Sequence, residues 1–312
     1  MVENSDLENV NNHQGGLTEY SYHVSEEIKH VWDVELDLLQ KLLDVCEKHH
    51  LKIWAYGGTL LGAVRHQGFI PWDDDIDLAM FREDYDKLCS IASEEFLHPY
   101  FFQTEYTDQG SFRGHAQLRN SNTTGILKSE VEYADYNQGI FIDIFPLDTK
   151  IDNSLYYRIQ VLEAKILKYL AKRLYWYPKG NHFNDKRLRY LVTCSVVKVL
   201  KCFVKPITIY RMFERVCQKY NYLSDSECVV AMEHVPGSIY DVFPRKCFKR
   251  IIWSKFEDMM IPVPEGYDQI LRTNYGDYMT PRKNVAYHGG VIFNTNLGYK
   301  EYLANIHRIK DM

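Results

Sequence analysis

Hydrophobic positions in the first 150 residues switch repeatedly between a helical and a strand period. Apolar side chains recur every three or four positions from Val31 to Cys46, which predicts an amphipathic helix, and Ser25 followed by two glutamates is typical of its start. The pattern over residues 60–65 and 82–95 is helical again. Short apolar runs predict strands at residues 52–56, 76–80, 100–104, 116–119 and 140–145. The expected fold class is therefore α/β (α+β), a mixed sheet flanked by helices.

The second half of the chain follows a different pattern. Residues 154–222 are helical and basic, with two to four helices expected; residues 150–219 hold 16 Lys and Arg against 4 acids, a net charge of +12 in a chain whose net charge is −5. This balance indicates an anionic partner. Residues 188–210 are apolar but too charged to span a membrane, which leaves a solvated basic face or a surface that lies on a membrane. Beyond them, a strand at 247–253 and a helix near 267–275 are expected.

The composition excludes several classes of protein. Hydrophobic residues make up 46% and charged residues 25% of the chain, which is ordinary for a soluble globular protein. Its seven cysteines occur singly, which argues against a disulfide framework and a zinc site, and the first 20 residues lack the apolar segment of a signal peptide. We therefore expect a cytoplasmic protein with reduced thiols, and no nucleic-acid partner.

Four carboxylates fall within five residues at Asp73, Asp74, Asp75 and Asp77. Carboxylates this close repel one another unless a cation neutralises them, and a hard cation such as Mg²⁺ is the usual reason for such a cluster. On an extended strand, Asp75 and Asp77 would leave the same face. Asp143 interrupts an apolar strand that Pro146 is expected to close, and a charge is costly there unless it coordinates or pairs. The alternative is a solvated acidic loop and a salt-bridged Asp143.

A Gly57-Gly58-Thr59 turn precedes the aspartates. If Thr59 caps the following helix, the turn offers backbone N–H groups to a phosphate. Gly-Gly-Thr, Asp-x-Asp and a distant strand aspartate together form a nucleotidyltransferase-type arrangement. Arg65 and His66 are placed to touch phosphate oxygens, with a structural salt bridge as the alternative for Arg65.

Three blocks of the sequence resemble the LicD family, phosphotransferases related to the eukaryotic fukutin and fukutin-related proteins. The first block runs from Gly57 to Met80 and continues through Arg82, Asp84 and Tyr85. The second covers residues 139–148, and the third covers residues 275–281 with His288. The basic middle of the chain lies outside the resemblance.

The resemblance implies a nucleotidyltransferase fold and the transfer of a phosphorylated alcohol to a glycan. The donor would be a CDP-alcohol, typically CDP-choline, and the acceptor a sugar hydroxyl of lipopolysaccharide, teichoic acid or capsule. Mg²⁺ or Mn²⁺ would be the cofactor. The chain would then comprise a flexible tail (1–24), a catalytic core (25–150), a basic helical region (151–228) and a C-terminal segment that completes the catalytic domain (229–312).

Within this resemblance the acidic residues take separate roles. Asp75 and Asp77 are the expected metal ligands, while Asp73 either completes the cage or sits behind it. Asp143 is either a further ligand or the general base that removes the acceptor proton. Three further candidates, each with a structural alternative, are Trp72 for stacking, Arg119 for nucleotide or acceptor, and His288.

Two other functions remain open on the sequence alone. An Asp-x-Asp motif also holds the diphosphate of a nucleotide sugar in glycosyltransferases, and a protein of this fold could be a non-catalytic glycan binder. Residues 154–222 are expected to face an anionic acceptor or the inner surface of a membrane, where lipid-linked glycans are assembled.

Overall fold

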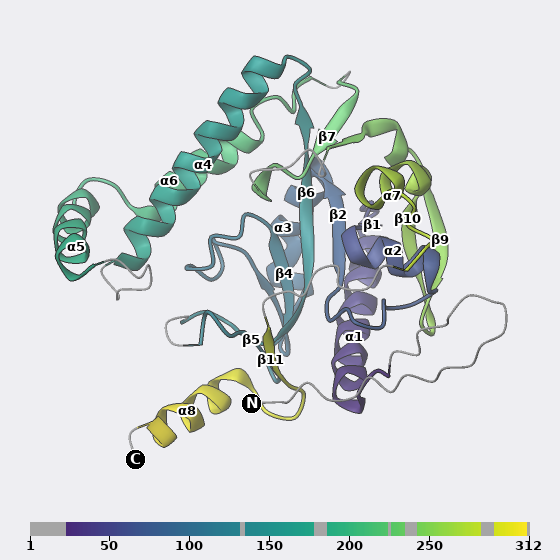
Figure 1. The fold of residues 1–312 in the computed structure, drawn as a ribbon, viewed down its shortest axis with the longest axis horizontal. Coiled ribbons are helices and arrows are strands. Elements are labelled where there is room, and N and C mark those ends of the chain that lie inside the picture. The colour runs from purple at the N-terminus through teal and green to yellow at the C-terminus, as the bar shows by residue number, and fades with distance from the viewer. Residues whose placement is uncertain are drawn as a thin grey trace, which may run out of the picture.

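The computed structural model of the chain describes residues 23–131, 135–177, 186–223, 226–234, 242–281 and 290–310. A mixed sheet with the strand order β1-β2-β6-β4-β3 forms its centre (Figure 1). β2 and β6 run parallel, and the pairs β1–β2, β6–β4 and β4–β3 are antiparallel. The strands are β1 (Trp54–Ala55), β2 (Asp77–Phe81), β3 (Tyr100–Gln103), β4 (Ala116–Asn120) and β6 (Ile140–Lys150). The predicted α/β class with a mixed sheet is confirmed.

Two helices, α1 (Glu26–Lys48) and α3 (Arg82–Glu95), pack on the sheet. The predicted start of α1 is confirmed, because Ser25 Oγ accepts a hydrogen bond from the Ile28 N–H at 3.3 Å. Leu38, Leu39 and Leu42 of α1 are fully buried in the main core. Both helices therefore form where the helical period of apolar residues predicts them.

A C-terminal hairpin fixes the loop that leads to the aspartates. Glu257, in the turn between β9 (Ile251–Phe256) and β10 (Met259–Pro264), accepts a hydrogen bond from the Phe69 N–H at 2.9 Å. Its own N–H donates to Gln67 O at 2.8 Å. The hairpin also contacts α2 (Gly57–Arg65). An element almost 200 positions further along the chain therefore holds the loop between α2 and β2 in place.

Two further C-terminal strands, β7 and β8, extend the central sheet, whereas β11 and β5 form a separate two-stranded sheet. β7 pairs with the end of β6 and with β8, and β11 pairs with β5. The helix α7 was predicted at its observed place, and α8 follows β11. The bounds are β5 (Thr124–Leu127), β7 (Cys228–Val230), β8 (Val242–Pro244), α7 (Tyr267–Tyr275), β11 (Val291–Asn294) and α8 (Tyr299–Lys310).

The basic region folds as an arm that projects from the sheet (Figure 1). It contains α4 (Ser154–Trp176), α5 (Arg187–Lys201) and α6 (Pro206–Cys217), within the predicted two to four helices. α4 and α6 bury a second core that includes Ala164, Ala171 and Phe213. In the part of the chain that the structure describes, no helix is long and apolar enough to cross a membrane.

Two strand boundaries differ from the prediction by several residues. β6 continues past Pro146 to Lys150. Its pairing with β4 ends at Ile144 and its pairing with β7 begins at Asp148. Pro146, which has no N–H to donate, falls between these two ladders, so the strand tolerates it. The strand expected from Cys247 starts later, since residues 245–248 form a 3₁₀ helix.

A buried ion pair joins α3 to the end of β6. Arg82 donates two hydrogen bonds to Asp148, from Nε at 2.9 Å and from Nη2 at 2.7 Å, and Asp148 is fully buried. The Asn221 amide, which follows α6, donates to the same carboxylate at 2.8 Å. The pair therefore connects the sheet, α3 and the base of the arm.

Replacing Asp148 with Asn should destabilise the protein by about 3–5 kcal/mol, because Arg82 would keep a buried charge without its counter-ion. Urea unfolding measures this change. Glu163→Gln is the matched control, since its pair with Lys219 is more than 40% exposed on both sides and should contribute less than about 1 kcal/mol. Equal losses in the two variants would contradict this account.

Candidate active site

The aspartates lie in a loop between α2 and β2 that packs against α1. Trp32 of α1 stacks on Phe69 with ring centroids 4.6 Å apart, and its Nε1 donates to Asp73 O at 3.1 Å. One carboxylate oxygen each of Asp73, Asp74 and Asp75 lies within 4.8 Å of the others. The loop thus gathers three carboxylates at the start of β2.

This arrangement corrects one part of the sequence argument. β2 begins at Asp77, so Asp75 precedes the strand, and strand alternation does not set its direction. Asp74, which alternation would turn away, lies with Asp73 and Asp75. The loop, rather than a strand face, brings the first three aspartates together.

The fourth and fifth carboxylates come from neighbouring strands. Asp77 and Asp143 are register partners in the parallel pair of β2 and β6, so they occupy equivalent positions side by side. The Asp143 N–H donates to Ile76 O at 2.8 Å, and the Tyr56 N–H donates to Asp77 O at 2.9 Å. Backbone hydrogen bonds therefore fix both aspartates next to the first turn of α2.

The two glycines leave room for these carboxylates. A Cβ on Gly57 would lie 2.8 Å from Asp77 Oδ2, and a Cβ on Gly58 would lie 2.5 Å from Asp73 Oδ2. Gly57 also has a φ of +51°, which favours glycine. Thr59 lies inside α2 and does not cap it; its Oγ1 accepts a hydrogen bond from the Asp77 N–H at 2.8 Å. Carboxylates at the first turn of α2 are favoured by the helix dipole.

Asp143 is held by two polar neighbours from β4 and the residue before it. Gln117 Nε2 donates to Asp143 Oδ1 at 2.6 Å, and His115 Nε2 lies 3.3 Å from the same oxygen. Burial acts to raise the pKa of Asp143, but His115, Gln117 and Arg113 outweigh it and lower that pKa. Burial lowers the pKa of His115. The pattern of apolar residues gave no sign of either neighbour.

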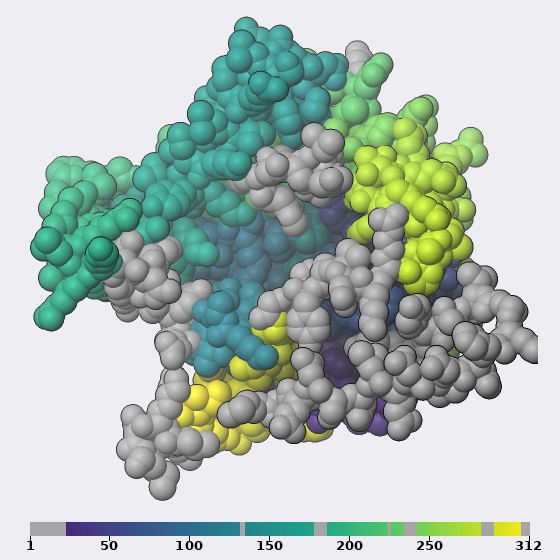
Figure 2. All heavy atoms as spheres, in the orientation of Figure 1, coloured from purple at the N-terminus to yellow at the C-terminus, as the bar shows by residue number. Residues whose placement is uncertain are grey.

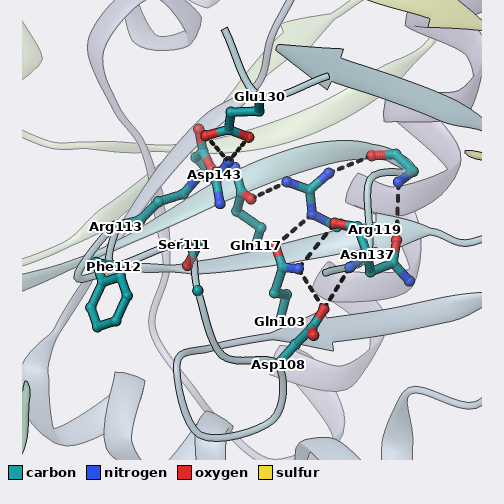
Figure 3. Close-up of polar contacts among 12 residues, drawn as sticks. Gln103, Asp108, Ser111, Phe112, Arg113, Gln117, Arg119, Glu130, Asn137 and Asp143 are labelled. Carbon is teal, nitrogen blue, oxygen red and sulfur yellow. Dashed lines mark hydrogen bonds and ion pairs between the residues drawn. The ribbon is translucent and has the colours of Figure 1, made fainter. Parts of the chain in front are cut away.

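Arg119 holds the side chain of Gln117, which in turn contacts Asp143 (Figure 3). Its guanidinium donates to the Gln117 side chain, to Gln103 Oε1 at 2.7 Å and to Gly139 O at 2.6 Å. With 1% of its surface exposed, Arg119 has no open face for a nucleotide or an acceptor. Arg119 therefore acts as a positioning residue for Gln117, and its buried position does not support the expected contact with a nucleotide or an acceptor.

Glu35 of α1 is a further acid that the sequence argument missed. It is 1% exposed, and its Oε2 is buried without a hydrogen-bond partner. Burial raises its pKa well above 4.5, and the charges of Asp74, Asp73, Asp143 and Asp77 add to the rise. The sequence contains one indication that Glu35 is buried: it lies on the apolar stripe of α1, four residues after Val31.

The remaining predicted site residues have mixed positions. Arg65 donates from Nη1 to Tyr278 O at 2.8 Å and from Nε to His66 Nδ1 at 3.3 Å, and among the described residues it makes no salt bridge. Burial and Arg65 lower the pKa of His66 to about 4. Trp72 is partly buried, with its ring 6.4 Å from that of His66. His288 lies outside the described residues.

The electrostatics of the cluster fit a hard divalent cation. Burial raises the pKa of Asp75 and of Asp77 well above 3.8, and the neighbouring carboxylates raise both further. Carboxylate oxygens are the ligands that Mg²⁺ and Mn²⁺ prefer. The charge of Glu35, whose Oε2 is buried without a hydrogen-bond partner, acts on Asp75 as well. A bound cation would remove the repulsion that the fold otherwise imposes on these groups.

The part of the chain that holds these residues is similar in sequence to known proteins. Residues 50–165 match the family described as LicD/FKTN/FKRP, nucleotidyltransferase domain. These residues form a LicD-family domain. The match contains the glycines, the aspartate loop, β2 and Asp143, whereas Glu35 lies outside it. The predicted resemblance is thereby confirmed.

Individual relatives differ in how much of this chain their similarity covers. It is 26% identical to the lipopolysaccharide cholinephosphotransferase LicD of Haemophilus influenzae, over 78% of this chain and 88% of that protein. It is 45% identical to an uncharacterized protein of Rickettsia prowazekii over 23% of this chain and 26% of that protein. It is 46% identical to the human ribitol 5-phosphate transferase FKRP over 14% of this chain and 9% of that protein.

Without divalent cations, the stability of the protein should fall as pH rises above the ordinary carboxyl pKa values of 3.8 and 4.5. The folded state holds protons on Asp75, Asp77 and Glu35 at pH values where the unfolded chain, with ordinary pKa values of 3.8 and 4.5, has released them. The stability present at low pH is therefore lost as pH rises through the raised pKa values. Thermal melts in EDTA between pH 5 and pH 8 measure this loss, and Mg²⁺ should reverse it at pH 8.

Glu35→Gln separates this effect from the rest of the molecule. It should reduce the pH slope in EDTA, while Glu47→Gln, an exposed change on the same helix, should leave the slope unchanged. A slope that is insensitive both to Mg²⁺ and to Glu35→Gln would contradict the electrostatic account.

Proposed function

We propose that this protein transfers a phosphorylated alcohol from a CDP-linked donor to a sugar hydroxyl of a glycan, with Mg²⁺ or Mn²⁺ as cofactor. The observation that carries the proposal is the pairing of Asp77 with Asp143 beside the Asp73–Asp75 loop, at the first turn of α2, inside a LicD-family domain. A cluster of carboxylates at the end of a sheet is suited to holding a cation that neutralises a phosphate donor.

The roles of the residues follow from their positions. Asp75 and Asp77 are the proposed ligands of the cation, and Asp73 either joins them or stands behind them. When bound, the cation would supply charge neutralisation for the phosphate oxygens and the departing CMP. Gly57 and Gly58 keep the backbone of α2 close to the carboxylates and leave its first N–H groups near the phosphate site.

Asp143 has two proposed roles, ligand or acceptor of the hydroxyl proton. His115 and Gln117 orient its carboxylate, and they keep it ionised by lowering its pKa. The acceptor hydroxyl would then attack the phosphorus that carries the alcohol, with the proton passing to a nearby base and CMP leaving.

The identity of the alcohol is a separate part of the proposal. The Haemophilus influenzae relative is named for choline phosphate and lipopolysaccharide, and the human relative for ribitol 5-phosphate. Because the match to the first relative covers most of both chains, we propose phosphocholine from CDP-choline as the first donor to test and CDP-ribitol as the second. We also propose a glycan or lipid-linked glycan acceptor at the inner face of a membrane, with peripheral contact through residues 154–222.

Incubating the full chain with Mg²⁺, an acceptor glycan and a panel of CDP-alcohols should release CMP and yield a phosphorylated product. Asp75→Asn and Asp143→Asn should each lower the rate at least about 100-fold, because both carboxylates act on the reacting phosphate. Asp258→Asn makes the same change in the exposed hairpin turn and should leave the rate unchanged.

Product formation is measured by mass spectrometry of the acceptor, since slow hydrolysis of the donor also releases CMP. UDP release from a UDP-sugar, with none from any CDP-alcohol, would instead support a glycosyltransferase. Glycan binding without turnover of either donor class would support a non-catalytic binder.

A further inference from the structure

Exposed apolar side chains concentrate on the arm. On α4 they form a stripe with steps of four and three residues, at Leu155, Ile159, Leu162, Ile166 and Tyr169, each at least 41% exposed. Steps of this kind place the side chains on one side of the helix. The opposite side of α4 already buries its own apolar residues against α6. The exposed stripe is therefore additional to what the core of the arm needs.

Helix α5 shows the same feature more strongly. Val197 is its one buried residue, while Leu188, Val192 and Val199 are each more than half exposed. Phe203, two residues after the end of the helix, is 82% exposed. A helix that leaves this much apolar surface in water gains little from the folding of its own chain, so an external apolar partner is expected.

The charges on the two helices indicate the nature of that partner. α5 carries four basic residues, Arg187, Arg189, Lys198 and Lys201, and no acid. In the sequence of α4, Glu163 is the single acid beside five Lys and Arg. A second copy of the chain would bring these positive charges together, whereas an anionic surface would neutralise them. Apolar stripes with basic neighbours are typical of helices that lie in the interface of a membrane.

The position of the helices agrees with a surface role. In Figure 2, α4 and α5 form an outer edge of the molecule, at a distance from the C-terminal hairpin and α7. Figure 1 shows α5 at the far end of the arm. The base of the arm is fixed to the sheet through Asn221 and Asp148, so the arm and the site are held in one framework.

We propose that α4 and α5 form a membrane-binding surface that rests on anionic lipid, with their exposed apolar stripes in the headgroup region. The proposal builds on the proposed function in one respect: the surface would bring the site to an acceptor carried by lipid. The binding itself does not depend on the identity of the donor or on catalysis.

Vesicle flotation of the full chain tests this surface. Vesicles of phosphatidylcholine with 30 mol% phosphatidylglycerol should bind at least about tenfold more protein than pure phosphatidylcholine vesicles, and high salt should reduce the difference. Two double variants, Leu162→Gln with Ile166→Gln and Val192→Gln with Val199→Gln, should each lower binding about tenfold. These sites are exposed, so folding is expected to persist, and circular dichroism checks it.

Leu97→Gln with Ile252→Gln is the matched control, because both residues are exposed apolar side chains outside the arm. It should bind vesicles like the unchanged protein. Equal binding to the two vesicle types, or binding that the arm variants do not change, would overturn the proposal. So would a stable dimer in light scattering that the Val192 and Val199 variant dissociates, since the surface would then be an interface between copies.

Activity with a soluble acceptor separates this inference from the proposed function. The arm variants should keep that activity while losing vesicle binding, and Asp75→Asn should lose activity while keeping vesicle binding. Loss of both properties in the arm variants, with folding intact, would overturn an independent membrane surface.

Discussion

Repulsion between buried carboxylates is the constraint on which the site depends. Burial makes Asp75 and Asp77 costly to charge, and nearby carboxylates add to that cost: Asp73 and Asp143 for both, and Glu35 of α1 for Asp75. The fold lowers this cost only in part. The first turn of α2 faces two of the carboxylates, and Gln117 and His115 stabilise the charge of Asp143. The remaining cost falls on Asp75, Asp77 and Glu35, whose pKa values stay raised, and a divalent cation would offset it.

Much of the fold could be predicted because it depends on local patterns. α1, α3 and α7 follow from helical spacing, and the cap at Ser25 follows from the residue type. Asp143 could be found before its partner strand was known, because a carboxylate in an apolar strand is costly without a partner. The exact start of β2 could not, since a strand begins where its neighbours pair with it, and this placed Asp75 in the loop.

The positioning residues show a different limit of sequence reasoning. Arg119 has the residue type of a phosphate ligand, yet its register beside Phe101 and Phe141 places it in the interior of the sheet. Glu35 and His115 reach the site through packing between elements far apart in the chain. Such contacts depend on tertiary structure, and no local period or motif marks them, apart from the polar residue on the apolar stripe of α1.

The proposed catalysis and the proposed membrane binding belong to different parts of the protein. The sheet and α2 hold the acidic site, the C-terminal hairpin fixes its loop, and the arm offers an apolar and basic surface. Anomalous diffraction from crystals grown with Mn²⁺ tests the central claim most directly. The account predicts a manganese peak within about 2.3 Å of carboxylate oxygens from Asp75 and Asp77. Ordered density for both side chains with no peak between them would contradict it.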